Sequence, residues 1–297
     1  MSSTSATIPP AAPWLAHLRR EAERFAEVVT LSPLRVHVPA YPDFTVYSLA
    51  VHIGRVLRLS HGIISTGSAE SQPVEVPDGD GVADWVLTAV DPLVTLLSEI
   101  PPDKPVPFPH QAGDRPAGLI APQLAVEVGV HRWDVESVLG EHVPIASDLA
   151  VQEVESVFAN FVPRLAGSGV ADIGGAVWLR TTDTAAAWSA RVSDGRLVTE
   201  RAPDSPSDTA VAVTGTAQDV ALLVWKRAVP PRPELGVTGS ADPQAFPRHR
   251  LHPRPAHHAG ALSSLPAGTV AGGYWPRSHC PGAMSSRASA GPQEPGW

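Results

Sequence analysis

The sequence contains a single cysteine, Cys280, among its 297 residues. One cysteine cannot form a disulfide within the chain, and it cannot supply the cysteine-rich shell that structural zinc sites prefer. Because Cys280 stands near the end of the sequence, any thiol chemistry in the main body would have to use an external thiol.

Lysine is nearly absent: Lys104 and Lys226 are the only two, and the formal net charge is −8. Nucleic acids and acidic membranes are bound by clustered basic side chains that displace counterions. The composition therefore argues against a nucleic-acid partner and against a membrane partner. The accompanying excess of arginine, alanine and proline indicates a GC-rich genome rather than a physical demand.

Long apolar runs are missing as well. None reaches the ~18 residues that a membrane-spanning helix needs, and residues 1–25 lack the cationic start and apolar core of a secretory signal. We therefore expect a cytoplasmic protein. With 43% hydrophobic and 18% charged residues, the chain is typical of a protein that buries a core, and its length favours two domains.

The first half of the chain has helical periodicity. Its apolar residues recur three and four positions apart, between segments rich in proline, glycine and aspartate. Thr45 and Ser147 are the expected N-caps of the second and fifth helices. The expected helices cover about residues 12–31, 46–66, 82–100, 119–139 and 147–167.

The periodicity changes from Gly174 onward. Four segments alternate or cluster β-forming residues and are separated by turn-like pairs, and a helix over 216–229 follows. An all-α bundle followed by a small α+β domain is the expected fold class. The expected divisions are a flexible N-terminus at 1–11, a helical domain at 12–168, an α+β domain at 169–243 and an atypical tail at 244–297.

The tail at 244–297 has five arginines, five histidines, eight prolines and one acidic residue, Glu294, without sustained periodicity. A disordered segment is one interpretation. Translation of GC-rich DNA in a shifted frame is the interpretation we favour, and resequencing the coding DNA would decide between them.

Two predicted helices carry residue types that ligate metals. Glu127 and His131 are four positions apart, so their side chains share one helix face, in a row that begins and ends apolar. His52 is the strongly polar member of another apolar row. An inward carboxylate needs a cation, a proton or a hydrogen-bond donor. A divalent metal held by these three residues would satisfy that need and leave one position open, as in catalytic zinc sites.

Spacing alone leaves an alternative open. His131 could instead hydrogen-bond Glu127 or a backbone carbonyl, and His52 could be an ordinary core histidine. Further histidines are expected on polar faces or in loops, where they would be solvated; these are His17, His37, His61, His110 and His142. A cluster of four of the five tail histidines is also left out of the site; these are His249, His252, His257 and His258.

Two segments carry a resemblance to a known family. "FTVYSLAVHIGRV" resembles the W-T-V-x-x-L-x-x-H helix of the mycothiol-dependent maleylpyruvate isomerase family, and "EVGVHRWD" resembles its E-x-x-x-H-R-W-D helix. "GGAVWLRTTD", "LLVWKR" and "LGVTGSAD" are similar to parts of its sterol-carrier-like C-terminal domain. The resemblance covers about residues 12–242.

The resemblance implies a DinB-like helical bundle that binds a divalent metal, usually zinc, through the positions of His52, Glu127 and His131. It further implies mycothiol, an actinobacterial thiol, as cofactor. The family reaction adds the mycothiol thiolate to the conjugated double bond of maleylpyruvate, allows rotation, and eliminates the thiol to give the trans isomer. A zinc-bound thiol is deprotonated near neutral pH, which makes it a nucleophile.

The resemblance also implies roles for neighbouring residues. Arg227 matches a family arginine and could bind a substrate carboxylate, although a solvent-exposed arginine at a helix end is an equal alternative. Asp134 could hydrogen-bond His131, cap another helix or pair with Arg132. Trp133 is expected to pack in the core or at an interface. Phe44 replaces the usual tryptophan, and Ser48 lacks the acid that would complete a capping box with Thr45.

Three functions remain open at this stage. The first is an isomerase of the maleylpyruvate type, and the second is a mycothiol S-transferase that acts on another small electrophile. The third is a non-catalytic metal-binding or thiol-sensing protein. The sequence does not predict the oligomeric state.

Overall fold

The structure, a computed structural model, describes residues 8–68, 74–107, 113–162, 174–227 and 236–239. All of them lie in one compact unit, Met1–Arg254. Outside the described residues lie residues 1–7 of the expected flexible N-terminus, the boundary near residue 168 and the whole tail at 244–297, with Cys280 and the tail histidines. These expectations stay predictions.

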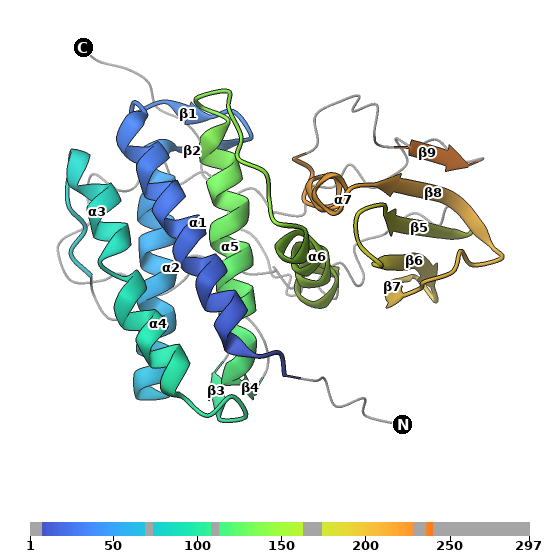
Figure 1. Cartoon of the computed structure of the whole chain (residues 1–297), viewed down its shortest axis with the longest axis horizontal. Coiled ribbons are helices and arrows are strands. Elements are labelled where there is room, and N and C mark those ends of the chain that lie inside the picture. The colour runs from blue at the N-terminus through green and yellow to red at the C-terminus, as the bar shows by residue number, and fades with distance from the viewer. Residues whose placement is uncertain (1–7, 69–73, 108–112, 163–173, 228–235, 240–297) are drawn as a thin grey trace, which may run out of the picture. The chain divides into compact units, whose positions relative to one another are not determined.

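Three long helices form close to where the periodicity predicted them. In Figure 1, α1 (Ala11–Leu31) lies alongside α2 (Val46–Thr66) and α5 (Ile120–Glu136). Helix α2 ends at Gly67, which adopts a left-handed conformation with φ 70° and is the glycine C-cap that the sequence favours. Phe25, Leu49 and Ile53 are fully buried between these helices.

The expected helix over 82–100 is two helices, so this prediction is corrected. α3 (Val82–Leu87) follows a short 3₁₀ turn, η1 (Gly79–Gly81), and α4 is Val90–Glu99. Pro92 explains the break, because its ring would clash with the carbonyl of Thr88 if the helix were continuous.

Among the described residues, the stretch Gly79–Glu99 is long and apolar enough to span a membrane by length and composition alone. Core helices pass the same test, so this is weak evidence for a span. Val82, Val86 and Leu93 are buried, and both helices of the stretch contact α1 and α2. The expected absence of a membrane partner stays a prediction.

Helix α5 lies at the centre of the bundle. It follows a 3₁₀ turn, η2 (Ala117–Leu119), and is buried on nearly all sides. Helix α6 (Ser147–Ser156) continues into a π-helical turn, η3 (Val157–Phe161). The N-cap of α6 is Ala146 rather than the expected Ser147, which is the first helical residue.

The α+β part contains a five-stranded sheet in the order β7-β6-β5-β8-β9. β5 and β8 are parallel and the other neighbours antiparallel. Asp194 and Gly195, both with positive φ, make the tight turn between β6 and β7. The strands are β5 (Ala176–Thr181), β6 (Ala187–Ser193), β7 (Arg196–Arg201), β8 (Thr209–Gly215) and β9 (Gly236–Gly239).

Helix α7 (Ala217–Val224) follows β8 and contacts both the sheet and α6. Thr216 caps it, because its side chain accepts a hydrogen bond from the backbone N–H of Asp219. Because α7 ends at Val224, the helix is shorter at its C-terminal end than the expected helix over 216–229. Residues 228 and 229, at the end of that expected helix, lie outside the described residues.

Two small hairpins were not predicted. β1 (His37–Val38) pairs with β2 (Tyr41–Thr45), and β3 (Pro105–Pro107) pairs with β4 (Asp114–Pro116). The prolines within these segments conceal the strand pattern, because proline cannot donate to a ladder. The first hairpin leads directly into α2 and so lies beside His52.

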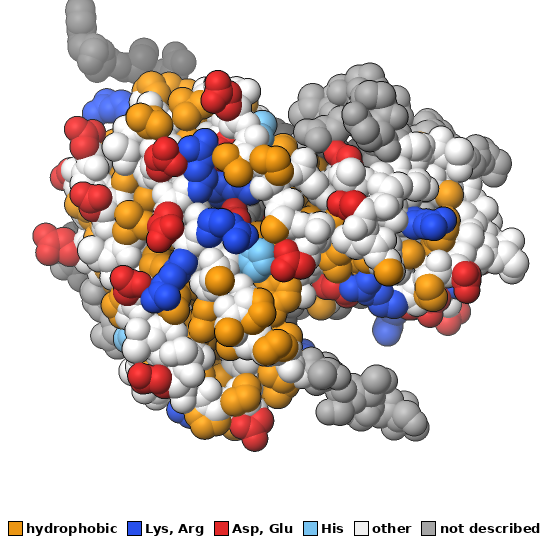
Figure 2. Space-filling model, in the orientation of Figure 1, with side chains coloured by type: hydrophobic (Ala, Val, Ile, Leu, Met, Phe, Trp, Pro, Cys, Tyr) orange, Lys and Arg blue, Asp and Glu red, His pale blue; other side chains and the backbone are white. Residues whose placement is uncertain are grey.

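Charged side chains on the helical part form many exposed pairs. Arg19 lies 3.0 Å from Asp91, and Arg24 lies 2.8 Å from Glu27. Figure 2 shows acidic and basic side chains interspersed on this face rather than separated by sign. The expected absence of a nucleic-acid partner stays a prediction.

Candidate metal centre

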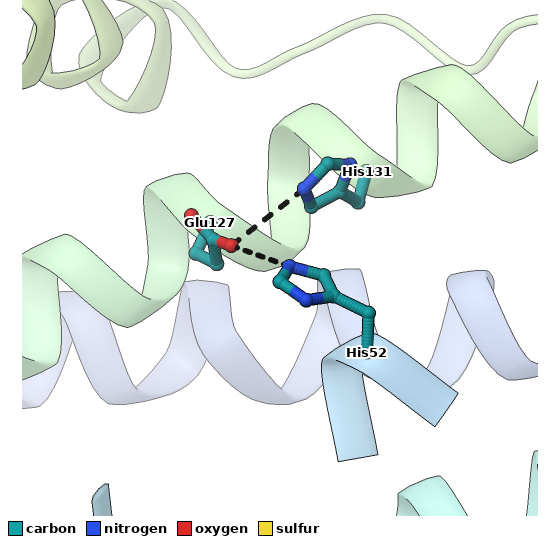
Figure 3. A group of neighbouring side chains, drawn as sticks. All are labelled: His52, Glu127 and His131. Atoms are coloured by element: carbon teal, nitrogen blue, oxygen red, sulfur yellow. Dashed lines mark hydrogen bonds and ion pairs between the residues drawn. The ribbon is translucent and has the colours of Figure 1, made fainter. Parts of the chain in front are cut away.

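The three residues predicted as metal ligands lie together in the structure. His52 comes from α2, and Glu127 and His131 come from successive turns of α5, with all three side chains directed toward one point (Figure 3). Glu127 Oε1 lies 3.0 Å from His52 Nε2 and 3.6 Å from His131 Nε2. One ligand atom of each residue lies within 4.8 Å of the others.

The position of His52 depends on how α2 begins. Ser48 N–H donates to Thr45 Oγ1 at 3.2 Å, and Thr45 N–H donates to Ser48 Oγ at 2.9 Å. This is a complete capping box, so the prediction that Ser48 breaks the box was wrong. A serine hydroxyl reaches the N-cap amide as an acid would, and the box fixes the first turn of the helix two turns before His52.

Buried charge is balanced within the trio. Burial alone would raise the pKa of Glu127, but hydrogen bonds from His131 and His52 outweigh it and hold the pKa below its ordinary value. Burial would lower the pKa of His131, but Asp134 and Glu127 outweigh it and raise the pKa to about 9. Without an ion, a proton on His131 therefore neutralises the half-buried carboxylate of Glu127.

Asp134 supports His131 from the side away from Glu127. Its Oδ2 lies 3.0 Å from His131 Nδ1, and the carboxylate is fully buried. Burial would raise the pKa of Asp134, but the charge and hydrogen bonds of Arg227 and His131 outweigh it and lower the pKa to about 2. Of the three roles that the sequence left open for Asp134, the contact with His131 is observed.

Arg227 is buried, so the alternative of a solvent-exposed arginine is wrong. Its Nε and Nη2 donate to the two oxygens of Asp134 at 2.9 and 2.8 Å, and its Nη1 donates to the carbonyl of Trp225 at 2.9 Å. The partner of its guanidinium is thus Asp134. Binding of a substrate carboxylate by Arg227 stays a prediction.

The donor set suits a divalent metal. Two imidazole nitrogens and one carboxylate oxygen are typical ligands of catalytic zinc, which binds them at about 2 Å. When His131 Nδ1–H donates to Asp134, Nε2 keeps its lone pair for a metal, as in carboxylate–histidine–zinc arrangements. The spread of 4.8 Å can close around one ion by small side-chain shifts.

Two aromatic residues beside the trio were not predicted as site residues. The Tyr41 ring stacks on His131, with centroids 6.0 Å apart, and the Phe44 ring lies 5.7 Å from that of His52. Both come from β2. The guanidinium of Arg227 lies 4.9 Å over the Tyr41 ring. Burial raises the pKa of Tyr41 to about 12, so its phenol stays protonated near neutral pH.

The two residues that follow His131 in sequence are both buried. Arg132 is fully buried and donates to Glu21 at 2.8 Å and to Glu136 at 2.6 Å, which ties α5 to α1. Trp133 is buried and stacks on His142 with centroids 3.9 Å apart. The ion pair of Arg132 with Glu21 thus connects α5 to α1.

One histidine outside the site differs from its prediction. His17 is buried rather than solvated, and its Nε2 lies 2.8 Å from Asp148 Oδ2, which connects α1 to α6. His37 is exposed and His61 half-buried. His110 lies outside the described residues.

The comparisons with known proteins concern the family and the fold of the chain. Residues 15–136 match the family described as mycothiol maleylpyruvate isomerase N-terminal domain. A crystal structure of the mycothiol-dependent maleylpyruvate isomerase, and one of a histidine-to-alanine mutant of that enzyme, are similar. Each is 14% identical, with a TM-score of 0.53, over 79% of this chain and 95% of the other. No curated protein matches.

At this identity the solved structures establish the fold. They confirm the predicted class, a helical N-terminal bundle followed by an α+β part. The family match confirms the resemblance that the motifs around His52 and His131 indicated, since both lie within residues 15–136.

Proposed function

We propose, from the premise that residues 15–136 belong to the mycothiol maleylpyruvate isomerase N-terminal domain family, that this protein is a metal- and mycothiol-dependent isomerase. The proposed substrate is an unsaturated carboxylate of the maleylpyruvate type, which is converted from the cis to the trans isomer. The observation that carries the proposal is the convergence of His52, Glu127 and His131 within 4.8 Å.

The proposed reaction begins when the sulfur of the external thiol adds to the conjugated double bond. The bond that has become single rotates, and elimination restores the double bond and releases the thiol. The thiol is regenerated, so the reaction needs no oxidant or reductant. A free thiol with a pKa of about 8.5 is mostly protonated at neutral pH. A divalent ion at the site would supply the positive charge that keeps a bound thiol deprotonated.

The residues of the chain would bind and orient. His52, Glu127 and His131 would hold the ion, preferably zinc, and leave a fourth position for the thiol. Asp134, 3.0 Å from His131, keeps the ring of that ligand in place. The rings of Tyr41 and Phe44 cover the two imidazoles on one side and would keep water away from them. Less water strengthens the electrostatic interactions on which the proposed reaction depends.

A turnover assay tests the proposal. Protein purified without a histidine tag would be mixed with zinc, mycothiol and maleylpyruvate, and fumarylpyruvate would be measured. We expect isomerisation only when zinc and mycothiol are both present. Glu127→Gln should abolish it, because a neutral amide is a poor ligand. Glu141→Gln, at an exposed position, is the matched control and should retain activity.

Other outcomes would select the alternative functions. A stable thioether formed from another electrophile, without isomerisation of maleylpyruvate, would identify an S-transferase. Zinc binding without turnover of any electrophile would identify a metal-binding or thiol-sensing protein. Either result would contradict the proposed isomerase while leaving the metal site intact.

A further inference from the structure

We infer that Arg227 is a positioning residue for the metal centre, acting through Asp134 on His131. The affinity of the helical part for metal then depends on an arginine that the α+β part supplies. The inference rests on the proposed metal site and goes beyond it, because this role of Arg227 does not involve the substrate.

The contact between Arg227 and Asp134 is a buried, two-pronged ion pair. Its hydrogen bonds measure 2.9 and 2.8 Å, and the two side chains are 5% and 0% exposed. Paired, parallel hydrogen bonds fix the plane of a carboxylate as well as its position. A lysine could supply the charge but not this fork.

The fixed carboxylate in turn fixes the imidazole. Asp134 Oδ2, which accepts from Arg227, also lies 3.0 Å from His131 Nδ1. A carboxylate in that place keeps the hydrogen on Nδ1 and leaves Nε2 to face Glu127 and the metal. If Asp134 rotated, the orientation of the His131 ring would no longer be fixed. The ring nitrogen that carries the hydrogen would no longer be fixed either.

The backbone before Arg227 directs its side chain toward this contact. Lys226 has a left-handed conformation, with φ 58°. Its N–H donates to Leu223 O, and the N–H of Arg227 donates to Leu222 O, at 3.0 and 2.7 Å. This turn normally takes glycine, because a side chain is strained there. The residue before Arg227 thus has a strained backbone conformation, a feature that recurs at functional sites.

Two simpler roles for Arg227 make different predictions. If the ion pair only held α7 against the bundle, its loss would lower stability and leave the zinc affinity of the folded protein unchanged. If Arg227 only bound a substrate carboxylate, its loss would raise KM and leave zinc affinity unchanged. Zinc affinity measured without substrate therefore separates the positioning role from both.

The test is the zinc dissociation constant, measured at fixed pH by competition with a chromophoric chelator. We expect Arg227→Gln to weaken zinc binding about 10–100-fold, the usual effect of losing a group that orients a ligand. Arg227→Lys should weaken it less. In an Asp134→Asn background, Arg227→Gln should cause no further loss, because its effect passes through Asp134. Thermal unfolding of each zinc-free variant would establish that it is folded.

Arg58→Gln is the matched control. Arg58 also donates several hydrogen bonds, to Gly54 O, Trp85 O and Thr88 Oγ1, but it has no contact with the trio. This variant should lose stability and keep its zinc affinity.

Two results would overturn the inference. One is wild-type zinc affinity in both Arg227→Gln and Arg227→Lys. The other is an equal loss of affinity on Arg227→Gln with and without the Asp134→Asn change. If the wild-type protein bound no zinc, the proposed function would fail together with the inference. If the wild type bound zinc and the variants gave either result above, only the inference would fail.

Discussion

Glu153 differs from the other buried acids of the bundle, because its two carboxylate oxygens have no hydrogen-bond partner among the described residues. Burial raises the pKa of Glu153 well above its ordinary value; the positive charges of Arg132 and Arg227 oppose the shift, and Glu21 and Asp134 add to it. The side chain is therefore protonated in the folded protein at pH values where it would ionise in the unfolded chain.

This difference predicts how stability depends on pH. The folded state holds a proton that the unfolded chain releases above its own pKa, about 4.3, so the contribution of Glu153 to stability falls as pH rises from there toward the raised folded pKa. Glutamine is neutral at every pH. Relative to the wild type, the unfolding free energy of Glu153→Gln should therefore rise by up to ~1.4 kcal/mol per pH unit within that window. Urea unfolding between pH 5 and pH 8 would measure the difference.

Glu141→Gln is the control for this experiment, because Glu141 is exposed. Its stability should follow that of the wild type across the pH range. Parallel curves for Glu153→Gln and the wild type would contradict the assignment of a protonated Glu153.

Single residues were predicted from the sequence only where the relevant pattern is local. Glu127 and His131 are neighbours on one helix, so their spacing indicates a shared face. The pair of Asp134 with Arg227 joins positions 93 residues apart, and no periodicity reports such a contact. Tyr41 was missed because β2 holds a proline and reads as a loop.

Among the elements, α2 places His52, and its N-terminus depends on one pair of side chains. Thr45→Ala removes the hydroxyl that accepts from Ser48 N–H. The expected loss is about 1 kcal/mol of unfolding free energy, typical of a lost N-cap. Chemical denaturation measures it.

Thr66→Ala, at the other end of α2, is the matched control for the cap. The Thr66 hydroxyl donates to Gly62 O and is exposed, so its loss should change the unfolding free energy by less than ~0.5 kcal/mol. Equal effects of the two variants would contradict a capping role for Thr45.

The packing of α2 on α3 depends on Gly54. A Cβ at this position would overlap the ring of Trp85. Gly54→Ala should therefore destabilise the protein by ~1–3 kcal/mol despite the better helix propensity of alanine. Thermal unfolding would register a lower melting temperature.

Gly62 on the same helix provides the comparison, because nothing lies within 4 Å of a Cβ placed there. Gly62→Ala should stabilise the protein by ~0.5–1 kcal/mol through helix propensity alone. If both variants raised the melting temperature, close packing at Gly54 would be contradicted.

Element type was predictable where periodicity is sustained, as in α1, α2 and α5. The break between α3 and α4 was missed although Pro92 signals it, because the apolar pattern continues across the gap. Strand order could not be predicted: β5 pairs in parallel with β8, three strands further along the chain, and alternation within a strand does not specify its neighbour.

In the whole molecule, a continuous set of contacts connects the helical bundle with the α+β part. It runs from Glu127 through His131 and Asp134 to Arg227, with the Tyr41 ring stacked on His131 and facing the Arg227 guanidinium. The family match covers the first three of these residues and ends before Arg227. At one end of this set, Glu127 and His131 face His52, and we propose that these three residues bind one divalent metal ion.

Zinc content per chain tests that claim most directly. Protein purified without a histidine tag, loaded with zinc and freed of excess by dialysis, should retain one ion per chain. His52→Ala, Glu127→Gln and His131→Ala should each lose it, while His37→Ala, at an exposed position, should retain it. Full zinc content in all three site variants would contradict the metal centre.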